Sequence, residues 1–376
     1  MAQTDSDVVV IGGGIAGVSI GYELASDCAV TLLEAESTLA YHTTGRSAAT
    51  FLETFGDIDI RALTTAGRDF LTTPPDCFHT PLMTPGPQLT YAAPGNEAEL
   101  EAHHREVVSL VPAVELVSAA DIRALVPYVR DGAATLGLYD PSSMAVDVDA
   151  LHSGFVRGMT ARGGRVYRDA RVVGCARRDG LWQISTSDGG EFRAPIVVDA
   201  AGAWADAVGT LAGAVPIGLQ PKRRTAFMVA CPANLDTATL PLFGDLDYSF
   251  YIKPEATQLL CSPGDETPVP PHDAKPDEVA IAQAIEQINE TTTLNIRSIR
   301  TPWAGLRSFT ADHRFVVGED PRQPGFFWCA GQGGYGIQTA PATARLGASL
   351  IRGEPVPADI AARGLDAAMV SPQRFA

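Results

Sequence analysis

Lysine is scarce in this sequence of 376 residues, which holds three Lys against 25 Arg. Acidic residues outnumber basic residues by 44 to 28, and the formal net charge is −16. Proteins that bind nucleic acid usually present a basic surface, so this balance argues against that class and against docking on anionic lipid. A fixed positive site is therefore expected to be an arginine, whose planar guanidinium suits a carboxylate.

Paired cysteines and long apolar runs are also missing. The six Cys form no CxxC pair and complete no zinc pattern with the seven His, so we expect no metal site. Such cysteine usage suits a reducing cytosol and favours a cytoplasmic location. The apolar run 8–20 contains four Gly and is too short to cross a membrane, and no Lys or Arg precedes Arg46 to begin a signal peptide. We expect no transmembrane segment.

The N-terminal segment carries a dinucleotide-binding pattern. A predicted strand at 7–11 leads into GGGIAG at 12–17, a helical pattern follows, and a second strand ends at Glu34. Gly12 permits a tight turn, Gly14 lets the backbone approach a pyrophosphate, and Gly17 lets the helix pack closely on the strand. The helix N-terminus presents N–H groups to the phosphates, and Glu34 can accept hydrogen bonds from a ribose. Glu34 disfavours NADP, but this unit alone leaves both NAD and FAD open.

Small-residue turns later in the chain favour FAD. Residues 41–49 (YHTTGRSAA) form a small polar loop entering a predicted helix, where an NAD enzyme would continue with another regular crossover. A strand at 196–198 runs into the turn 200–204, and a strand at 326–330 runs into the glycine-rich turn 331–336 before a helix to about 351. The cofactor-binding region is therefore predicted to be discontinuous.

The remaining regular elements follow from capping and turn signals. We expect three helices: one at 147–162, one that begins at the capping box 118–121, and one from 276 to 289. A hairpin is expected over 171–186, and strands at 225–230 and 249–252.

Six stretches carry a specific resemblance. They are VVVIGGGIAGVS (8–19), YHTTGRSAA (41–49), GLQPKRRTAF (218–227), SFYIKP (249–254), TPWAGLRSFTAD (301–312) and GQGGYGIQT (331–339). The sequence resembles the FAD-dependent D-amino-acid oxidase and glycine oxidase superfamily over nearly the whole chain. Within that superfamily it is most similar to the bacterial D-arginine dehydrogenases.

The resemblance implies an α/β fold (α+β overall) with two domains and non-covalent FAD. A discontinuous Rossmann-like FAD-binding domain would comprise 1–50, 143–217 and 307–376. A substrate-binding domain with a mixed β-sheet would comprise 51–142 and 218–306. Some relatives attach flavin through a cysteine, but Cys329 lies within a predicted buried strand, which disfavours such a link.

Motif and resemblance together give the expected cofactor-binding residues. They are Gly12, Gly14, Ile15, Ala16, Gly17, Glu34, Ala35, Thr43, Thr44, Arg46, Ser47, Ala48, Ala49, Val172, Val173, Ala201, Gly202, Trp204, Gly331, Gly333, Gly334, Tyr335, Gly336, Ile337 and Gln338.

The chemistry that the resemblance implies is oxidation of a D-amino acid. Hydride passes from the α-carbon to flavin N5, and the imino acid hydrolyses to a 2-oxo acid and ammonia. By resemblance, Arg307 clamps the substrate carboxylate, Tyr251 adds a phenol and Arg224 a second cation. Gly334 and Gln338 correspond to positions that contact the substrate amine.

Three positions depart from the D-arginine dehydrogenase pattern. Gln88 stands where those enzymes have a glutamate that pairs with the guanidinium, Thr50 replaces a histidine, and Phe55 replaces a tyrosine. We interpret these residues of the substrate pocket as a shift toward neutral or broad-range D-amino acids.

Other functions stay open at this stage. The same fold and clamp serve oxidases or dehydrogenases of secondary or N-methyl amino acids, and a non-catalytic FAD-binding protein or an NAD-dependent dehydrogenase are further interpretations. The electron acceptor is a quinone or oxygen, and the resemblance favours a dehydrogenase.

Overall fold

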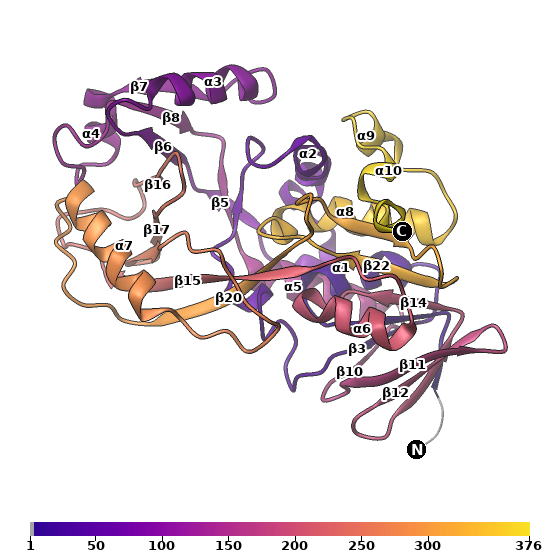
Figure 1. The fold of residues 1–376 in the computed structure, drawn as a ribbon. Helices are drawn as coiled ribbons and strands as arrows, with labels where there is room; N and C mark the ends of the chain where they lie inside the picture. Colours follow the sequence, from indigo (N-terminus) through magenta and orange to yellow (C-terminus); the bar gives the residue numbers. More distant parts are fainter. Residues whose placement is uncertain (1–3) are drawn as a thin grey trace.

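The computed structural model describes residues 4–376. It contains a mostly parallel sheet, one strand of which leads into the glycine motif (Figure 1). Its strands are parallel except the last, which is antiparallel to its neighbour. In order across the sheet they are β10 (Arg165–Tyr167), β3 (Val30–Leu33), β2 (Val8–Ile11), β14 (Ile196–Asp199), β22 (Phe326–Ala330) and β21 (Val316–Glu319).

Both faces of this six-stranded sheet are covered, which explains its continuous apolar runs. Side chains alternate along β2: Val8 and Val10 join the core under three helices, whereas Val9 and Ile11 face the opposite core. The helices of the first face are α1 (Ile15–Leu24), α5 (Val148–Ala161) and α8 (Gly336–Ile351). The second face carries α6 (Ala205–Ala212) and a sheet of β1 (Thr4–Asp5), β13 (Glu191–Ala194), β12 (Leu181–Thr186) and β11 (Val172–Arg178).

A nine-stranded mixed sheet makes up the other end of the molecule (Figure 1). All its pairs are antiparallel except that between β16 and β6. In order they are β19 (Thr267–Pro268), β15 (Gln220–Ala230), β18 (Gln258–Ser262), β17 (Tyr251–Glu255), β16 (Leu242–Asp245), β6 (Gln88–Ala92), β8 (Leu136–Asp140) and β7 (Glu115–Ser118), with β20 (Pro302–Phe309) beside β15.

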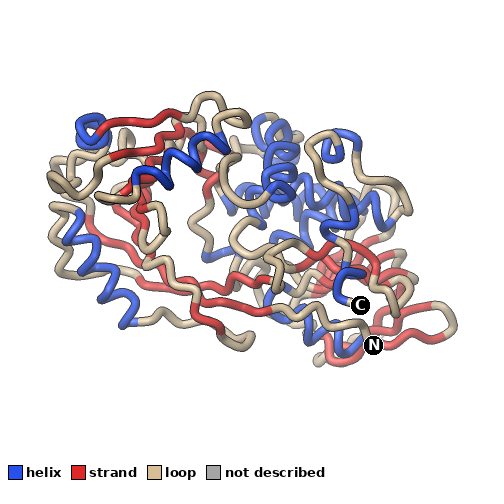
Figure 2. Tube along the Cα trace, turned by 45° about the horizontal axis from the view of Figure 1, so that its top comes forward, coloured by secondary structure: helices blue, strands red, loops and turns tan. Residues whose placement is uncertain are grey.

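The long ribbon of β15 and β20 connects the two ends. In Figure 2 the molecule is elongated, and strands run from the end that carries α7 (Glu278–Thr291) toward the six-stranded sheet. β20 pairs with β15 from Pro302 to Phe309, so it crosses the expected domain boundary at 306/307 without interruption. The division into two domains stays a prediction.

The remaining elements connect these layers. Among residues 4–376, no helix has both the length and the apolar character needed to cross a bilayer. A three-stranded sheet is formed by β4 (Thr50–Phe51), β9 (Met144–Val146) and β5 (Met83–Pro85). The remaining helices are α2 (Ile58–Thr72), α3 (Glu97–Val107), α4 (Ala119–Leu125), α9 (Ala358–Ala361) and α10 (Ala367–Val370). The 3₁₀ turns are η1 (Thr44–Arg46), η2 (Asp76–Phe78), η3 (Gly202–Trp204) and η4 (Pro372–Phe375).

Most predicted elements are confirmed, but the helix expected after residues 41–49 is wrong. A short 3₁₀ turn over Thr44–Arg46 is followed by strand β4 instead. Tertiary hydrogen bonds decide the conformation here: the Thr43 hydroxyl donates to the Leu306 carbonyl at 2.7 Å, and the Arg46 guanidinium donates to the Ala304 carbonyl at 3.0 Å. These bonds fasten the loop to β20 and override local propensity.

The glycine turn is supported from below by a histidine that the motif did not reveal. His152, on α5, is 6% exposed, and its Nε2 hydrogen-bonds the Gly13 carbonyl at 2.9 Å. Burial lowers the pKa of His152 below its ordinary value of 6.5, and the bond to Gly13 opposes this only in part. The neutral ring therefore donates Nε2–H to the turn.

Replacing His152 is expected to weaken the acid sensitivity of folding. Because its pKa is lowered in the folded state, the contribution of His152 to stability is fully present above pH 6.5 and is lost as the pH falls through the folded-state pKa. His152→Gln places an uncharged amide donor there, so its free energy of unfolding should fall less than that of wild type between pH 7.5 and 5.5. Urea unfolding measures this, and an equal fall in both proteins would contradict it.

Two helical glycines form a matched pair for a second test. A Cβ at Gly17 would lie 1.9 Å from the Gly12 carbonyl oxygen, whereas a Cβ at Gly67 would have no neighbour closer than 3.6 Å. Gly17→Ala should destabilise the fold by roughly 1–3 kcal/mol through overpacking. Gly67→Ala should leave stability unchanged or raise it by up to about 1 kcal/mol. Thermal unfolding compares them, and equal melting temperatures would refute the close packing of α1.

Candidate active site

Two adjoining cavities open at the carboxyl ends of β2, β14 and β22. We name the first the Glu34 cavity, about 340 Å³, and the second the Arg307 cavity, about 200 Å³. Ligands of open parallel sheets bind at this edge. Both cavities share the lining residues Gly14, Thr43, Thr44, Ala200, Gly202 and Ala203, so together they form a cleft for an extended ligand with two halves.

The Glu34 cavity has the groups that an adenosine half requires. Gly12 has φ +111°, which suits only glycine, and the α1 N-terminus begins at Gly14. Glu34 accepts hydrogen bonds from the Gly13 N–H at 2.7 Å and the Glu36 N–H at 2.8 Å. Each carboxylate oxygen keeps a further lone pair for a ribose hydroxyl. The geometry therefore fits the predicted dinucleotide turn.

The cavity wall beside Glu34 includes residues that the motif did not identify. The His42 ring lies 4.5 Å from the Trp204 ring between centroids, and its Nε2 is 3.1 Å from Glu36 Oε1. Asp199 ends β14 below the turn at 200–204; it is fully buried, and burial raises its pKa well above the ordinary value. Its Oδ1 accepts from the Ala201 N–H at 3.0 Å, which fixes this turn. Neither residue gives a sequence signal beyond its place at a strand or loop end.

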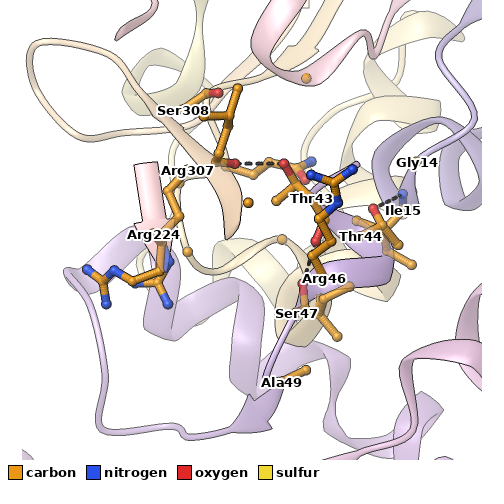
Figure 3. Close-up of a pocket in the computed structure, with 18 of the residues that line it drawn as sticks. Gly14, Ile15, Thr43, Thr44, Arg46, Ser47, Ala49, Arg224, Arg307 and Ser308 are labelled. Carbon is orange, nitrogen blue, oxygen red and sulfur yellow. Dashed lines mark hydrogen bonds between the residues drawn. The ribbon is translucent and has the colours of Figure 1, made fainter. Parts of the chain in front are cut away.

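Loop 43–50 lines the Arg307 cavity, and Figure 3 shows its residues Thr43, Thr44, Arg46, Ser47 and Ala49. Thr44 Oγ1 accepts from the Ile15 N–H at 3.0 Å, so part of the α1 N-terminus is already bonded. Arg46 lines the Arg307 cavity, but its Nη2 pairs with Asp273 at 2.6 Å and its Nη1 bonds the Ala274 and Ala304 carbonyls. Arg46 thus holds the loop in place.

Arg307 supplies an unneutralised positive charge. It projects from β20 into the cavity beside the glycine-rich turn, where a Cβ at Gly334 would lie 3.0 Å from its Nη1. Across residues 4–376, Arg307 forms no ion pair with a carboxylate. Tyr251, 9% exposed on β17, lines the same cavity. Arg307 and Tyr251 thus line one cavity, as the predicted carboxylate clamp requires.

Arg224 lies near Arg307, and both side chains are labelled in the left half of Figure 3. Its guanidinium is already engaged: Nε donates to the Asp265 carbonyl at 2.8 Å and Nη2 to Glu266 Oε1 at 2.9 Å. Burial, reinforced by the Arg307 charge, lowers the pKa of Arg224 to about 10. Lys222 also bonds Glu266, at 3.0 Å. Arg224 therefore lines the cavity with its charge paired to Glu266, which weakens its expected role as a second free cation.

The side-chain amide of Gln338 already has two protein partners. It lines the Arg307 cavity, but its Oε1 accepts from the Leu52 N–H at 3.2 Å and its Nε2 donates to Thr64 Oγ1 at 3.0 Å. Its amide is thus committed to holding Leu52 and α2 against α8. Each end of the amide keeps one further lone pair or N–H, so contacts of Gln338 and Gly334 with a substrate amine stay a prediction.

An aromatic cluster lies beside the Arg307 cavity. The Phe55 ring lies 5.1 Å from Tyr248 and 5.2 Å from Tyr335 between centroids. Phe55 and Thr50 line the cavity as predicted. Gln88 is 6% exposed and lies behind the cluster, with its Nε2 3.5 Å from the Tyr248 hydroxyl. Sequence reasoning missed Tyr248, whose position follows only from tertiary packing.

Most of the predicted cofactor residues line the cleft, and three do not. Val173 is 52% exposed, Gly17 packs α1 against the turn, and Tyr335 contacts Phe55. The residues in the lining are Gly12, Gly14, Ile15, Ala16, Glu34, Ala35, Thr43, Thr44, Arg46, Ser47, Ala48, Ala49, Val172, Ala201, Gly202, Trp204, Gly331, Gly333, Gly334, Gly336, Ile337 and Gln338.

Comparison with known proteins agrees with this cleft. Residues 7–350 match the sequence profile of the family described as FAD dependent oxidoreductase. The mitochondrial sarcosine dehydrogenase of Mus musculus is 26% identical over 227 residues, which cover 56% of this chain and 24% of that protein. This chain thus matches about a quarter of the length of that relative.

Other similarities extend over the whole chain. Glycine oxidase of Geobacillus kaustophilus (strain HTA426) is 24% identical over 379 residues, covering 94% of this chain and 95% of that enzyme. The crystal structure of glycine oxidase from this species superposes with a TM-score of 0.86 at 21% identity, covering 99% of both chains. L-proline dehydrogenase from P. horikoshii also gives 0.86 at 21% identity, covering 100% of this chain and 98% of that one.

These similarities and the geometry of the cleft agree on the cofactor. The glycine turn and Glu34 suit the adenosine half of FAD, and the turn at 331–336 suits the flavin half. The chain belongs to the FAD-dependent oxidoreductase family, and FAD is its cofactor.

Proposed function

We propose that this protein is an FAD-dependent dehydrogenase of neutral D-amino acids. The observation that carries the proposal is the unpaired Arg307 guanidinium in a cavity that also holds Tyr251 and adjoins the glycine-rich turn. The named relatives act on glycine, sarcosine and L-proline, all of them amino acids with a carboxylate. A bidentate arginine is the usual clamp for that group.

In the proposed mechanism the residues of the chain position the substrate. Arg307 donates two N–H groups to the carboxylate and the Tyr251 hydroxyl adds a third bond. The Gly334 carbonyl accepts from the substrate amine, and the Phe55 ring, packed on Tyr248 and Tyr335, excludes water from the side chain. When bound, FAD would supply the acceptor for the α-hydrogen, which leaves as hydride, and the imino acid would hydrolyse in water to a 2-oxo acid and ammonia.

Two features support non-covalent FAD and a neutral substrate side chain. Burial raises the pKa of the Cys329 thiol to about 12, so the thiol stays protonated and is a poor nucleophile. Gln88 is neutral, and the cluster in front of it is aromatic. A cationic side chain would therefore find no carboxylate at position 88, whereas an apolar one would pack on rings.

Oxidation of secondary or N-methyl amino acids is the second candidate. The names of the sarcosine and L-proline enzymes favour it, since the same clamp would serve either amine. Anaerobic bleaching of the flavin by D-Leu, D-Met, D-Phe, D-Arg, sarcosine and L-proline separates the candidates. Fastest bleaching by a neutral D-amino acid supports the proposal, and fastest bleaching by sarcosine or proline replaces it.

Truncating the clamp should impair substrate binding alone. Arg307→Met removes a charged donor from a carboxylate, so kcat/KM for D-Met should fall by about 10²–10³-fold. Bound FAD and the melting temperature should remain those of wild type, because Arg307 has no ion-pair partner among residues 4–376. The exposed Arg177→Met serves as the control. Steady-state kinetics measure the effect, and a change of less than threefold would remove Arg307 from the clamp.

The neutral residue behind the aromatic cluster generates a specificity prediction. Gln88→Glu adds a carboxylate beside Tyr248, so the kcat/KM ratio of D-Arg to D-Leu should rise by about tenfold or more. Gln88→Met removes the same hydrogen bonds without adding charge and should not raise the ratio. Identical ratios in the two variants would show that position 88 does not select the side chain.

A further inference from the structure

A third cavity of about 630 Å³ lies on the other side of loop 43–50. We name it the Lys253 cavity. It is bounded by the segment 81–87, the start of α5, and the strands β9, β15, β17, β18 and β20. No part of the proposed mechanism uses this space.

A single layer of chain separates this cavity from the Arg307 cavity. Ser47, Ala49 and Thr50 line both of them. Between these residues, Ala48 packs in one cluster with Leu260 and Tyr251. A molecule in the Lys253 cavity would therefore lie close to the cofactor while the carboxylate clamp remained occupied.

The lining combines apolar side chains with polar ones, among them Lys253, Glu255 and Asp147. Met228, Leu242, Leu260 and Trp303 supply apolar surface. Lys253 is only 8% exposed, and its Nζ contacts Glu255 Oε2 at 3.0 Å. An ammonium has three donors, so further N–H groups of Lys253 can serve an acceptor in the cavity.

The wall is also held rigidly. The Trp303 indole N–H donates to the Arg46 carbonyl at 3.0 Å, and Arg46 is itself tied to Asp273 and Ala304. The indole is thus fixed next to the loop that both cavities share. Ligand sites are typically preformed spaces of about 300–1,000 Å³ with a few placed polar groups, and the volume of the Lys253 cavity lies in this range.

We propose that the Lys253 cavity binds a quinone, the electron acceptor of the reaction, at a site separate from the amino acid. A quinone has a planar apolar ring for Trp303 and the leucines, and carbonyl oxygens that accept from Lys253. Molecular oxygen would fill only a small part of 630 Å³. This proposal rests on the function proposed above.

The electron balance is that of an ordinary two-electron reduction. The quinone takes up two electrons from the reduced cofactor through the layer of residues 47–50, and two protons, one given up by the cofactor and one from solvent. Its two carbonyl groups become hydroxyl groups, the cofactor returns to the oxidised form, and the hydroquinone leaves.

The test uses holoenzyme that dithionite has reduced, so that it does not require any amino-acid substrate. Ala238→Trp adds an indole at the exposed rim of the Lys253 cavity, and Ala120→Trp, exposed on α4, is the matched control. Anaerobic mixing with menadione should reoxidise the flavin at least tenfold more slowly in Ala238→Trp than in wild type or control. Calorimetry on the oxidised holoenzyme should show menadione binding at least tenfold more weakly in the same variant.

Two further arms separate the alternatives. Saturating benzoate, a carboxylate for Arg307, should leave reoxidation by menadione within twofold, and Lys253→Gln should weaken menadione binding without filling the cavity. Wild-type rates and affinities in both variants, or complete inhibition by benzoate, would overturn the quinone site. Equal slowing of reoxidation by oxygen and menadione in Ala238→Trp would replace the quinone with a general route to the cofactor. Failure of every amino acid to bleach the flavin would instead overturn the proposed function.

Discussion

The site depends on the hydrogen bonds between loop 43–46 and strand β20. Thr43 and Arg46 donate to carbonyls of this strand, at Leu306 and Ala304. The cofactor cleft belongs to a parallel sheet and the clamp to a mixed sheet, so this junction sets their relative position. The bonds bring Arg307 beside Gly334, where the absence of a Cβ leaves room for the guanidinium.

Charge in this cavity is controlled by pairing. The chain carries a net charge of −16, yet Arg307 has no carboxylate partner in the described range 4–376. Its neighbour Arg224 is held by Glu266 and the Asp265 carbonyl, and Glu266 is shared with Lys222. One guanidinium is thus neutralised and one is left for an anion. The Phe55 ring, packed on Tyr248 and Tyr335, adds an apolar surface to the same cavity.

Local signals in the sequence predicted the elements but not the contacts between distant segments. The glycine turn, Glu34, the capping box at Ser118 and the hairpin turn at Asp179 are short-range patterns, and each is found where the pattern places it. The loop after residue 43 was expected to enter a helix because its partners on β20 lie some 260 residues away in the chain.

The same limit applies to side-chain roles. The resemblance assigned Gln338 to the substrate, and the sequence did not reveal that its amide also bonds Leu52 and Thr64. Tyr335 and Val173 sit next to lining residues and point elsewhere, to Phe55 and to solvent. His152, Asp199 and Tyr248 act through tertiary contacts that no spacing in the sequence encodes.

The central claim is that Arg307 holds the carboxylate of an amino acid beside FAD. A crystal structure of the oxidised holoenzyme with the product 2-oxo acid tests it most directly. We expect a carboxylate bidentate on Arg307 and within hydrogen-bond distance of the Tyr251 hydroxyl, with Arg224 still bound to Glu266. A carboxylate bound away from Arg307, or Arg307 turned to pair with Glu266, would contradict it.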